Sequence, residues 1–299
     1  MKQKNVGIFY IIMAAFFFAL MSFFVRKAGD LPTMQKAFFR NAVAMVISFV
    51  MLIRSDEGFK IKKGSIFGLN MRSVCGTIGL ICNFYAVDHM NISDANMLNK
   101  LSPFFAIIMS AFILKEMATG FEWSMVVLAF IGALFVAKPS FNVEAIPALI
   151  GAVGGLGAGT AYTFVRKLGK QGERGPVIVM YFSTFSSLVT LPFFIFGYQT
   201  MSIKQTLFLL FAGCSAAGGQ LSVTKAYTKA PAKEISVFDY SQVIFAAILG
   251  FLFLNQTPDI YSMIGYIIII GAAVIKWRHG MRVDEQDRKV KSNEETFDG

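Results

Sequence analysis

Charged side chains are scarce in this chain: Asp, Glu, Lys and Arg make up 15% of its 299 residues, whereas hydrophobic residues make up 55%. A soluble globular domain carries roughly 25% charged residues, so this balance indicates that lipid is the main solvent. The formal net charge of +10 does not indicate nucleic-acid binding, because the basic residues fall in short loops and a C-terminal tail instead of on one amphipathic face. We expect no nucleic-acid partner.

Cysteine and histidine are almost absent, with three and two residues. Cys75, Cys82 and Cys214 lie in apolar segments, and none has the CxxC or Cys/His spacing of a metal site. The histidines are His89 and His279, and the chain contains neither an HExxH motif nor a nucleophile elbow. We therefore expect no catalytic residues, no metal site, no cofactor and no enzyme activity.

Polar segments long enough to form a soluble domain are missing as well. A helix needs about 20 apolar residues to cross roughly 30 Å of hydrocarbon. The first such segment is predicted to be a retained span, because it is long for a signal peptide and no A-x-A cleavage signal follows it. Ten spans are predicted near residues 6–25, 33–53, 65–87, 93–114, 120–138, 145–165, 175–197, 204–227, 233–254 and 259–277.

The chain contains an internal repeat with an offset of 140 residues. Phe24-Val25-Arg26-Lys27 ends the first span and Phe164-Val165-Arg166-Lys167 ends the sixth (164 − 24 = 140). The same offset aligns residues 88–118 with residues 228–258 without a gap. Two tandem halves of about five spans each are a common construction of secondary transporters.

Lysine and arginine favour one set of loops, which predicts the orientation. With the N-terminus inside, 20 of them lie on the cytoplasmic side and Arg72 lies within a span. The seven on the other side are Arg26, Lys27, Lys36, Arg40, Lys100, Lys138 and Lys204. We therefore expect a multi-pass protein of the cell (inner or plasma) membrane with both termini cytoplasmic.

An odd number of spans in each half makes the two halves lie oppositely in the membrane. The predicted fold class is an all-α integral membrane protein whose ten transmembrane helices form two inverted five-helix repeats. The first repeat covers residues 1–139 and the second covers residues 140–277. Residues 278–299 are predicted to be a polar, disordered cytoplasmic tail, because their charges are mixed and they lack apolar periodicity.

The fourth span, from Asp94-Ala95-Asn96-Met97-Leu98 through Leu101-Ser102-Pro103-Phe104 to Leu114-Lys115-Glu116, resembles that of EamA-type carriers in the drug/metabolite transporter superfamily. In that family a small-residue helix start, a mid-helix proline and a terminal Glu recur. Phe39-Arg40-Asn41 and Arg72-Ser73-Val74-Cys75-Gly76 add to the match. The resemblance implies a ten-helix carrier that moves small metabolites by alternating access, with a structural or gating role for Glu116.

Two departures from related patterns bear on mechanism. Val243 stands in the second half where the first half has Pro103, which we expect to kink the fourth helix. The first span contains no acid, whereas the small multidrug members of the superfamily use a Glu there, so their proton/drug exchange cannot be carried over. Coupling would have to use Asp239 or a buried lysine, and uncoupled transport stays open.

Ionisable groups inside a membrane span are costly, so we read them first as functional. Asp239 is predicted to bind the coupling ion or a substrate amine; the alternative is a structural ion pair with Arg72. The repeat aligns Asp239 with Asn99 and Tyr240 with Lys100. Polar residues at equivalent positions in both halves predict a cavity wall along the pseudo-two-fold axis.

Arg72 and Lys100 are predicted to hold a substrate carboxylate or phosphate. For Lys100 the alternative is snorkelling to the nearby interface. Arg40 ranks lower than Arg72 and Lys100 as a substrate-binding residue. Glu234 lies near a helix start, where the helix dipole alone would stabilise its charge. The predicted substrate-binding residues are Arg72, Asn83, Tyr85, Asn99, Lys100, Tyr162, Gln220 and Tyr240. For the aromatic and amide members, the alternative is interhelical hydrogen bonding or an interfacial aromatic belt.

The predicted function is a secondary membrane transporter for a small polar or zwitterionic metabolite, amino-acid-like or nucleoside-like. The alternative is a lipid flippase or scramblase on the same scaffold. The expected partners are the small-molecule substrate and the lipid bilayer, and small-residue faces in spans five and ten permit a homodimer. Five glycines of the sixth span, from Gly151 to Gly159, are predicted to allow close helix packing.

Overall fold

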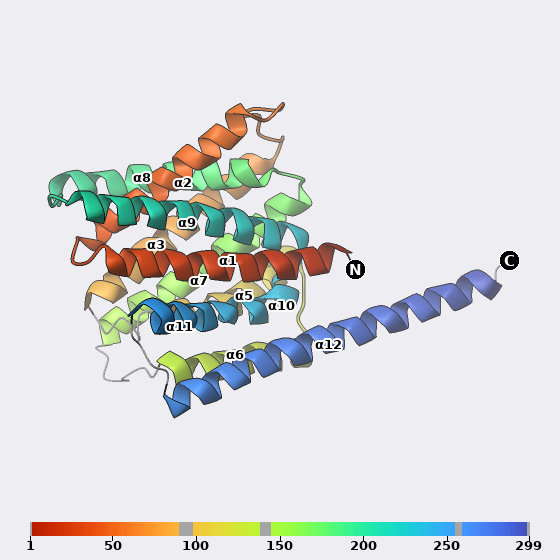
Figure 1. The fold of residues 1–299 in the computed structure, drawn as a ribbon. Helices are drawn as coiled ribbons and strands as arrows, with labels where there is room; N and C mark the ends of the chain where they lie inside the picture. Colours follow the sequence, from red (N-terminus) through yellow and green to blue (C-terminus); the bar gives the residue numbers. More distant parts are fainter. Residues whose placement is uncertain (1, 90–97, 138–144, 255–258, 298–299) are drawn as a thin grey trace.

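The computed structural model describes residues 2–89, 98–137, 145–254 and 259–297 (Figure 1). Within these ranges every regular element is a helix. Eight helical segments are long and apolar enough to cross a membrane, and two shorter apolar helices accompany them. Because hydrocarbon offers no hydrogen bonds, such segments fold as helices that pair their own backbone groups. The predicted all-α membrane fold class is confirmed.

The helices follow the two predicted repeats. The first repeat contains α1 (Lys2–Lys27), α2 (Thr33–Ile53), α3 (Ser65–His89), α5 (Ser102–Leu114) and α6 (Gly120–Ala137). The second contains α7 (Ala145–Lys170), α8 (Gly175–Phe196), α9 (Ile203–Lys229), α10 (Ala232–Ile235), the 3₁₀-helix η1 (Ser236–Tyr240), α11 (Ser241–Leu254) and α12 (Ile260–Phe297). The segment α10–η1–α11 forms one span, the ninth.

The packing of the helices obeys the same repeat. Helix α1 packs along α9, and its equivalent α7 packs along α3. Helix α5 packs along α7, and the equivalent α11 packs along α1. Helix α2 also packs against α9, and the equivalent α8 packs against α3. The contacts of α2 with α8 and of α6 with α12 join helices that are each other's equivalents. Each of these contacts is thus matched by its counterpart, as two-fold pseudosymmetry requires.

The two repeats run in opposite directions. Gly7, near the start of α1, lies against Ala230, which follows α9. Gly169, near the end of α7, lies against Thr228 at the end of α9. The beginning of α1 and the end of its equivalent α7 therefore meet at the same end of the bundle (Figure 1). We call it the terminal end, because α1 begins there and α12 extends beyond it.

Glycines let the long helices of the core approach backbone to backbone. A Cβ on Gly79 of α3 would lie 2.8 Å from the backbone nitrogen of Ala158. A Cβ on Gly157 of α7 would lie 2.8 Å from the carbonyl oxygen of Cys75. On another side of α7, Gly155 and Gly159 face the fourth span. The predicted packing role of the α7 glycines is confirmed by these contacts.

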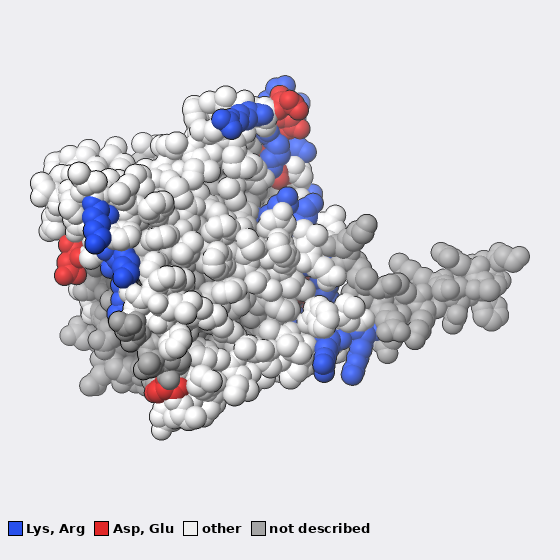
Figure 2. Space-filling model, in the orientation of Figure 1, with Lys and Arg blue, Asp and Glu red and all other residues white. Residues whose placement is uncertain are grey.

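On the face that Figure 2 shows, the described charged side chains gather at the two ends of the bundle, and the belt between them is uncharged. Large apolar side chains are exposed on this belt, among them Phe112 of α5 and Ile267 of α12. An exposed apolar belt of this kind is what a bilayer covers.

Helix α12 extends to Phe297, beyond the predicted last span, which ends near residue 277. The assignment of residues 278–299 to a disordered cytoplasmic tail stays a prediction.

Candidate functional site

Two membrane spans are interrupted at equivalent positions. In the ninth span the helix passes through the 3₁₀ turn η1, which ends at Tyr240. In the fourth span a turn at Lys100 and Leu101 precedes α5. The offset of 140 places Lys100 opposite Tyr240, so the interruptions coincide under the repeat. Discontinuous helices at a repeat interface are where secondary transporters bind substrate and coupling ions.

The break in the fourth span corrects the expected role of Pro103. Pro103 was expected to kink the middle of the fourth helix, but it lies in the first turn of α5. Proline is favoured there because the amide it lacks would have no intrahelical acceptor. The helix begins anew at this point, and Lys100 lies just before it.

Lys100 and Tyr240 mark the pseudo-two-fold axis. The Tyr240 hydroxyl donates to the backbone carbonyl of Lys100 at 2.9 Å. Since the two residues are equivalent under the repeat, their contact requires the axis to pass between them. Lys100 Nζ lies 3.2 Å from Asp239 Oδ2 and donates to Gln242 Oε1 at 2.7 Å. We call Lys100, Asp239, Tyr240 and Gln242 the axial cluster.

The axial cluster holds an ion pair inside the membrane. The side chains of Lys100 and Asp239 are 13% and 17% exposed, and Tyr240 is fully buried. A charge in hydrocarbon is costly, and a partner at this distance offsets part of that cost. The alternative that Lys100 snorkels to the interface is therefore wrong, and the alternative that Asp239 pairs with Arg72 is wrong as well.

Arg72 has a neutral partner in place of a carboxylate. It donates through Nη2 to Gln220 Oε1 at 3.0 Å. Its guanidinium lies 3.9 Å from the centre of the Phe182 ring, and only 2% of the residue is exposed. A Cβ on Gly76 would collide with the guanidinium, so this glycine makes room for it. The sequence named both Arg72 and Gln220, and the structure brings them together.

Tyr162 on α7 packs against the same core as Tyr240 of the axial cluster. Its ring stacks on Tyr227 of α9 at a centroid distance of 4.8 Å. We call Arg40, Arg72, Tyr162 and Gln220 the arginine tract. The tract and the axial cluster bring together side chains from both repeats.

The other predicted residues do not join these groups through any interaction of the described residues. Tyr85 stacks on His89 at 4.0 Å, near the end of α3. Asn83 lies where α3 meets α7, and its backbone nitrogen faces Gly154. Asn99 is half-buried beside Lys100. Their assignment to the substrate site stays a prediction.

Two residues of the site were not predicted. Gln242 follows Asp239 by three residues, which places both on one face of a helical turn, and this spacing was a usable signal. Tyr227 carries no such signal, because its role depends on stacking with Tyr162 from another helix. The described residues contain no group of three His, Cys, Asp or Glu side chains that could hold a metal ion.

Ion pairs close the terminal end of the bundle. Glu116, after α5, accepts from Arg166 Nη2 at 3.2 Å and Lys170 Nζ at 2.7 Å on α7. Glu122 of α6 pairs with Lys276 of α12 at 3.1 Å. These pairs join the first repeat to the second, and we call them, together with those in the next paragraph, the terminal ion pairs.

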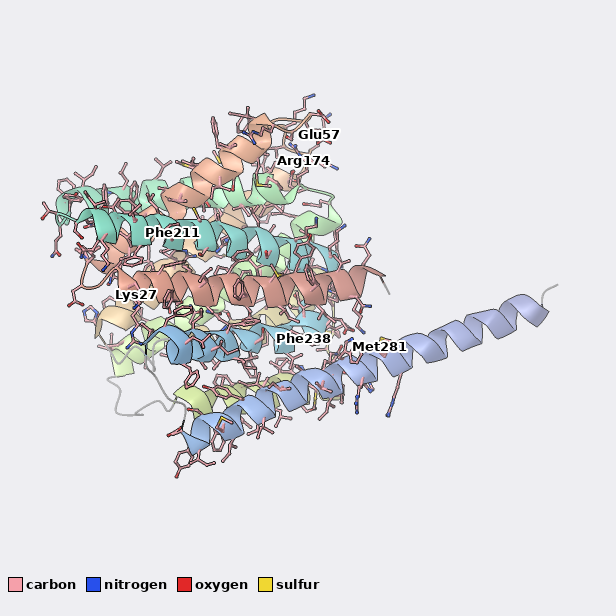
Figure 3. The ribbon with its side chains drawn as sticks, viewed as in Figure 1. Lys27, Glu57, Arg174, Phe211, Phe238 and Met281 are labelled. Carbon is pink, nitrogen blue, oxygen red and sulfur yellow. The ribbon has the colours of Figure 1, made fainter. Side chains whose placement is uncertain are left out.

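Three further pairs complete this set. Glu234 lies 3.2 Å from Lys4 and 3.5 Å from Lys276. Arg174 lies 3.2 Å from Glu57 at the same end, whereas Lys27 lies at the opposite end (Figure 3). Glu234 was attributed to the helix dipole alone, but these partners show that it is ion-paired.

Hydrogen bonds join the two repeats at the opposite end. Gln35 and the backbone of Gln199 exchange two hydrogen bonds of 3.0 Å. Gln205 donates to the carbonyl oxygen of Ala28 at 3.1 Å.

Comparisons with known proteins agree with the duplicated architecture. A sequence profile of the EamA-like transporter family matches residues 5–138 and again residues 145–277. The second match begins 140 residues after the first (145 − 5), which is the offset of the internal repeat. Together the two matches cover nearly the whole chain.

Several curated relatives align over most of their length. The pseudopaline exporter CntI of Pseudomonas aeruginosa (strain UCBPP-PA14) is 29% identical over 274 residues, which cover 90% of this chain and 94% of the relative. Human solute carrier family 35 member G1 is 26% identical, with 91% and 80% covered. The riboflavin transporter of Brucella anthropi is 26% identical, with 83% and 89% covered.

A solved crystal structure shares the fold. It superposes with a TM-score of 0.80 at 11% sequence identity and covers 93% of this chain and 99% of that chain. At this identity the likeness concerns the fold alone.

Proposed function

The chain belongs to the EamA-like transporter family, and from that membership we propose that it is a secondary carrier for a small polar or zwitterionic metabolite, amino-acid-like or nucleoside-like. The family makes it a multi-pass membrane transporter and not an enzyme. The mechanism we propose is alternating access across the cytoplasmic membrane.

The axial cluster is the observation that carries this proposal. It offers one acid, Asp239, and one base, Lys100, on the axis that relates two inverted repeats. A site on such an axis becomes accessible from either side when the repeats exchange conformations. A zwitterionic solute fits it, because its amine and its acid group would each find an opposite charge when the ion pair opens. Asp239 is also our proposed coupling-ion site.

The named relatives support a small organic solute. One is described as a pseudopaline exporter and another as a riboflavin transporter. Because these two relatives are named for different substrates, their names do not identify the solute of this chain. We therefore infer the class of solute from the side chains of the candidate site. We keep Asn83, Tyr85 and Asn99 as proposed members of the site alongside the axial cluster and the arginine tract.

We propose that the terminal end faces the cytoplasm, because 20 Lys and Arg residues fall on that side and seven on the other. Among the terminal ion pairs, the largely buried ones of Glu116 and Glu122 would then form the cytoplasmic gate. Glu116 holds two cations of the other repeat, and its side chain is only 14% exposed. This supports the gating role that the family resemblance implied for Glu116.

Weakening this gate should open the terminal end. In a Glu116→Gln variant, loss of the charge weakens both contacts to α7, and a loss of about 1 kcal/mol changes a two-state population roughly fivefold. We expect a cysteine introduced at buried Ser110, one turn before the gate, to react with a membrane-impermeant maleimide about fivefold faster from that side. The measurement is made in a background from which Cys75, Cys82 and Cys214 have been removed.

The matched control for this variant is Glu57→Gln. Glu57 is 61% exposed, and exposed ion pairs contribute little, so labelling should stay at the parental rate. Equal labelling rates in the Glu116→Gln variant and the parent would contradict the gate.

Reconstituted vesicles test the function itself. We expect purified protein in liposomes to give saturable uptake of a labelled solute from a panel of amino acids, nucleosides and organic acids. Empty liposomes are the control for leakage. Loss of labelled-lipid asymmetry without saturable solute uptake would instead identify the protein as a flippase or scramblase. A homodimer stays a prediction, which the mass of the purified protein in detergent would test.

A further inference from the structure

Two arginines of the arginine tract have no carboxylate partner: Arg72 is buried and Arg40 is half-buried. No described Asp or Glu lies within ion-pair distance of Arg40 or Arg72. The groups that contact the Arg72 guanidinium, Gln220 and the Phe182 ring, are both neutral. By contrast, Lys100 of the axial cluster has its own carboxylate.

The guanidinium groups also retain unused donors. The Nε atoms of Arg40 and Arg72 are fully buried and have no hydrogen-bond partner. A buried donor without a partner is destabilising, and a buried charge without a counter-ion is more so. A ligand that brings an anionic acceptor would satisfy both requirements at once.

The surroundings of Arg72 are built to hold it in place. Phe182 covers one face of the guanidinium, Gln220 fixes one end, and Gly76 leaves the space into which it folds. The facing helices α3 and α8 also carry buried hydroxyls without partners, at Ser73 and Ser183. Hydroxyl donors beside a planar guanidinium fork suit the oxygen atoms of a carboxylate or phosphate.

We propose that Arg40 and Arg72 bind an oxyanionic group, a carboxylate or a phosphate, of the transported solute. The inference rests on the proposed carrier function and adds the chemical class of its substrate: the solute carries an acidic group that enters the arginine tract. Arg40 lies seven residues into α2 from the opposite end, and Arg72 lies seven residues into α3 from the terminal end. The two guanidinium groups thus approach the middle of the membrane from its two sides.

A binding measurement tests the inference without requiring transport. The probes are succinate, glutamate and inorganic phosphate, compared with the cations cadaverine and choline, which carry no carboxylate or phosphate, at equal ionic strength. We expect at least one oxyanion to raise the Tm of the purified full-length protein by about 3 °C. Success with phosphate and failure with succinate and glutamate would identify phosphate as the group, and the reverse would identify a carboxylate.

Two variants test whether the Tm shift depends on the arginine tract. Arg72→Gln removes the charge, and Gly76→Ala keeps the charge but displaces the guanidinium; both should abolish the shift. The matched control is Arg282→Gln, because Arg282 is exposed on α12 and should leave the shift unchanged. If either tract variant is unfolded, the other decides.

Three results would overturn the inference. They are no Tm shift of the parent with any oxyanion probe, stabilisation by cadaverine or choline alone, and an undiminished shift in both tract variants. Uptake of labelled choline by the parent in vesicles, without uptake of any oxyanion, would overturn the acidic substrate class and leave the carrier function standing. Absence of all solute uptake would overturn the carrier function, while the Tm shift would still decide whether the tract binds oxyanions.

Discussion

Replacing Asp239 with Asn is expected to abolish solute transport, with a fall of roughly tenfold or more in the uptake rate, which corresponds to at least about 1.4 kcal/mol. The substitution preserves the shape of the side chain and removes the only carboxylate that pairs with Lys100 among the described residues. The substrate amine or coupling ion would then lose its partner on the pseudo-two-fold axis. Uptake into reconstituted vesicles, measured across a range of pH, provides the test.

The Asp239→Asn variant should remain folded. Removing one partner of a fully buried ion pair costs about 3–5 kcal/mol. Here both side chains are partly exposed, and Lys100 keeps its hydrogen bond to Gln242. We therefore expect a smaller loss, visible as a lower Tm of a protein that still elutes as a single species.

A double variant separates a transport role from a structural one. Lys100→Gln combined with Asp239→Asn removes both charges, so it should recover much of the Tm lost in the single variant. If the pair only stabilises the fold, transport should recover together with the Tm. If Asp239 acts in transport, the double variant should stay inactive. Parental uptake and parental pH dependence in the single Asp239→Asn variant would contradict a coupling role.

The spans were largely predictable because their signal is local. A run of about 20 apolar residues needs no tertiary information to be read as a membrane helix. The predicted second span, 33–53, coincides with α2, Thr33–Ile53. The fourth span is the exception, because its break at Lys100 depends on the contact with Tyr240 in the other repeat. A window average over 93–114 cannot detect a break that a partner helix stabilises.

The site was predictable in its residues but not in its pairing. The repeat singled out positions 99/239 and 100/240, and the structure places Lys100, Asp239 and Tyr240 on the axis. Asp239 was matched with Arg72 on the basis of similar depth alone. Depth along a helix follows from residue number, but the direction of a side chain around the bundle depends on how ten helices pack, which the sequence of one helix does not specify.

The repeat offset of 140 residues also predicts which residues can lie on the pseudo-two-fold axis. Two residues separated by the repeat offset lie on or near the axis whenever they touch, so the alignment of Lys100 with Tyr240 already marked them as candidates for direct contact. The same reasoning makes the terminal ion pairs informative. Those of Glu116, Glu122 and Lys4 join one repeat to the other at the terminal end.

Replacing Gly157 with Val is expected to prevent correct folding. A Cβ at this position would lie 2.8 Å from the carbonyl oxygen of Cys75 and 2.9 Å from Gly79 Cα. These are backbone atoms of α3, so no side-chain rotation relieves the clash, and α3 and α7 must move apart. Overpacking a core typically costs 1–3 kcal/mol, and separation of two core helices should exceed about 3 kcal/mol.

The measurement is the yield and Tm of monodisperse protein from size-exclusion chromatography in detergent. A graded series makes it specific: Gly157→Ala should lower the Tm, and Gly157→Val should leave little or no monodisperse protein. The matched control is Gly271→Ala in α12, where a Cβ meets open space and alanine favours the helix by about 1 kcal/mol, so the Tm should hold or rise. A Gly157→Val protein with parental Tm would contradict the close crossing of α3 and α7. Since that crossing and its counterpart between α1 and α9 hold the two repeats together, its loss should also remove the arginine tract and the axial cluster.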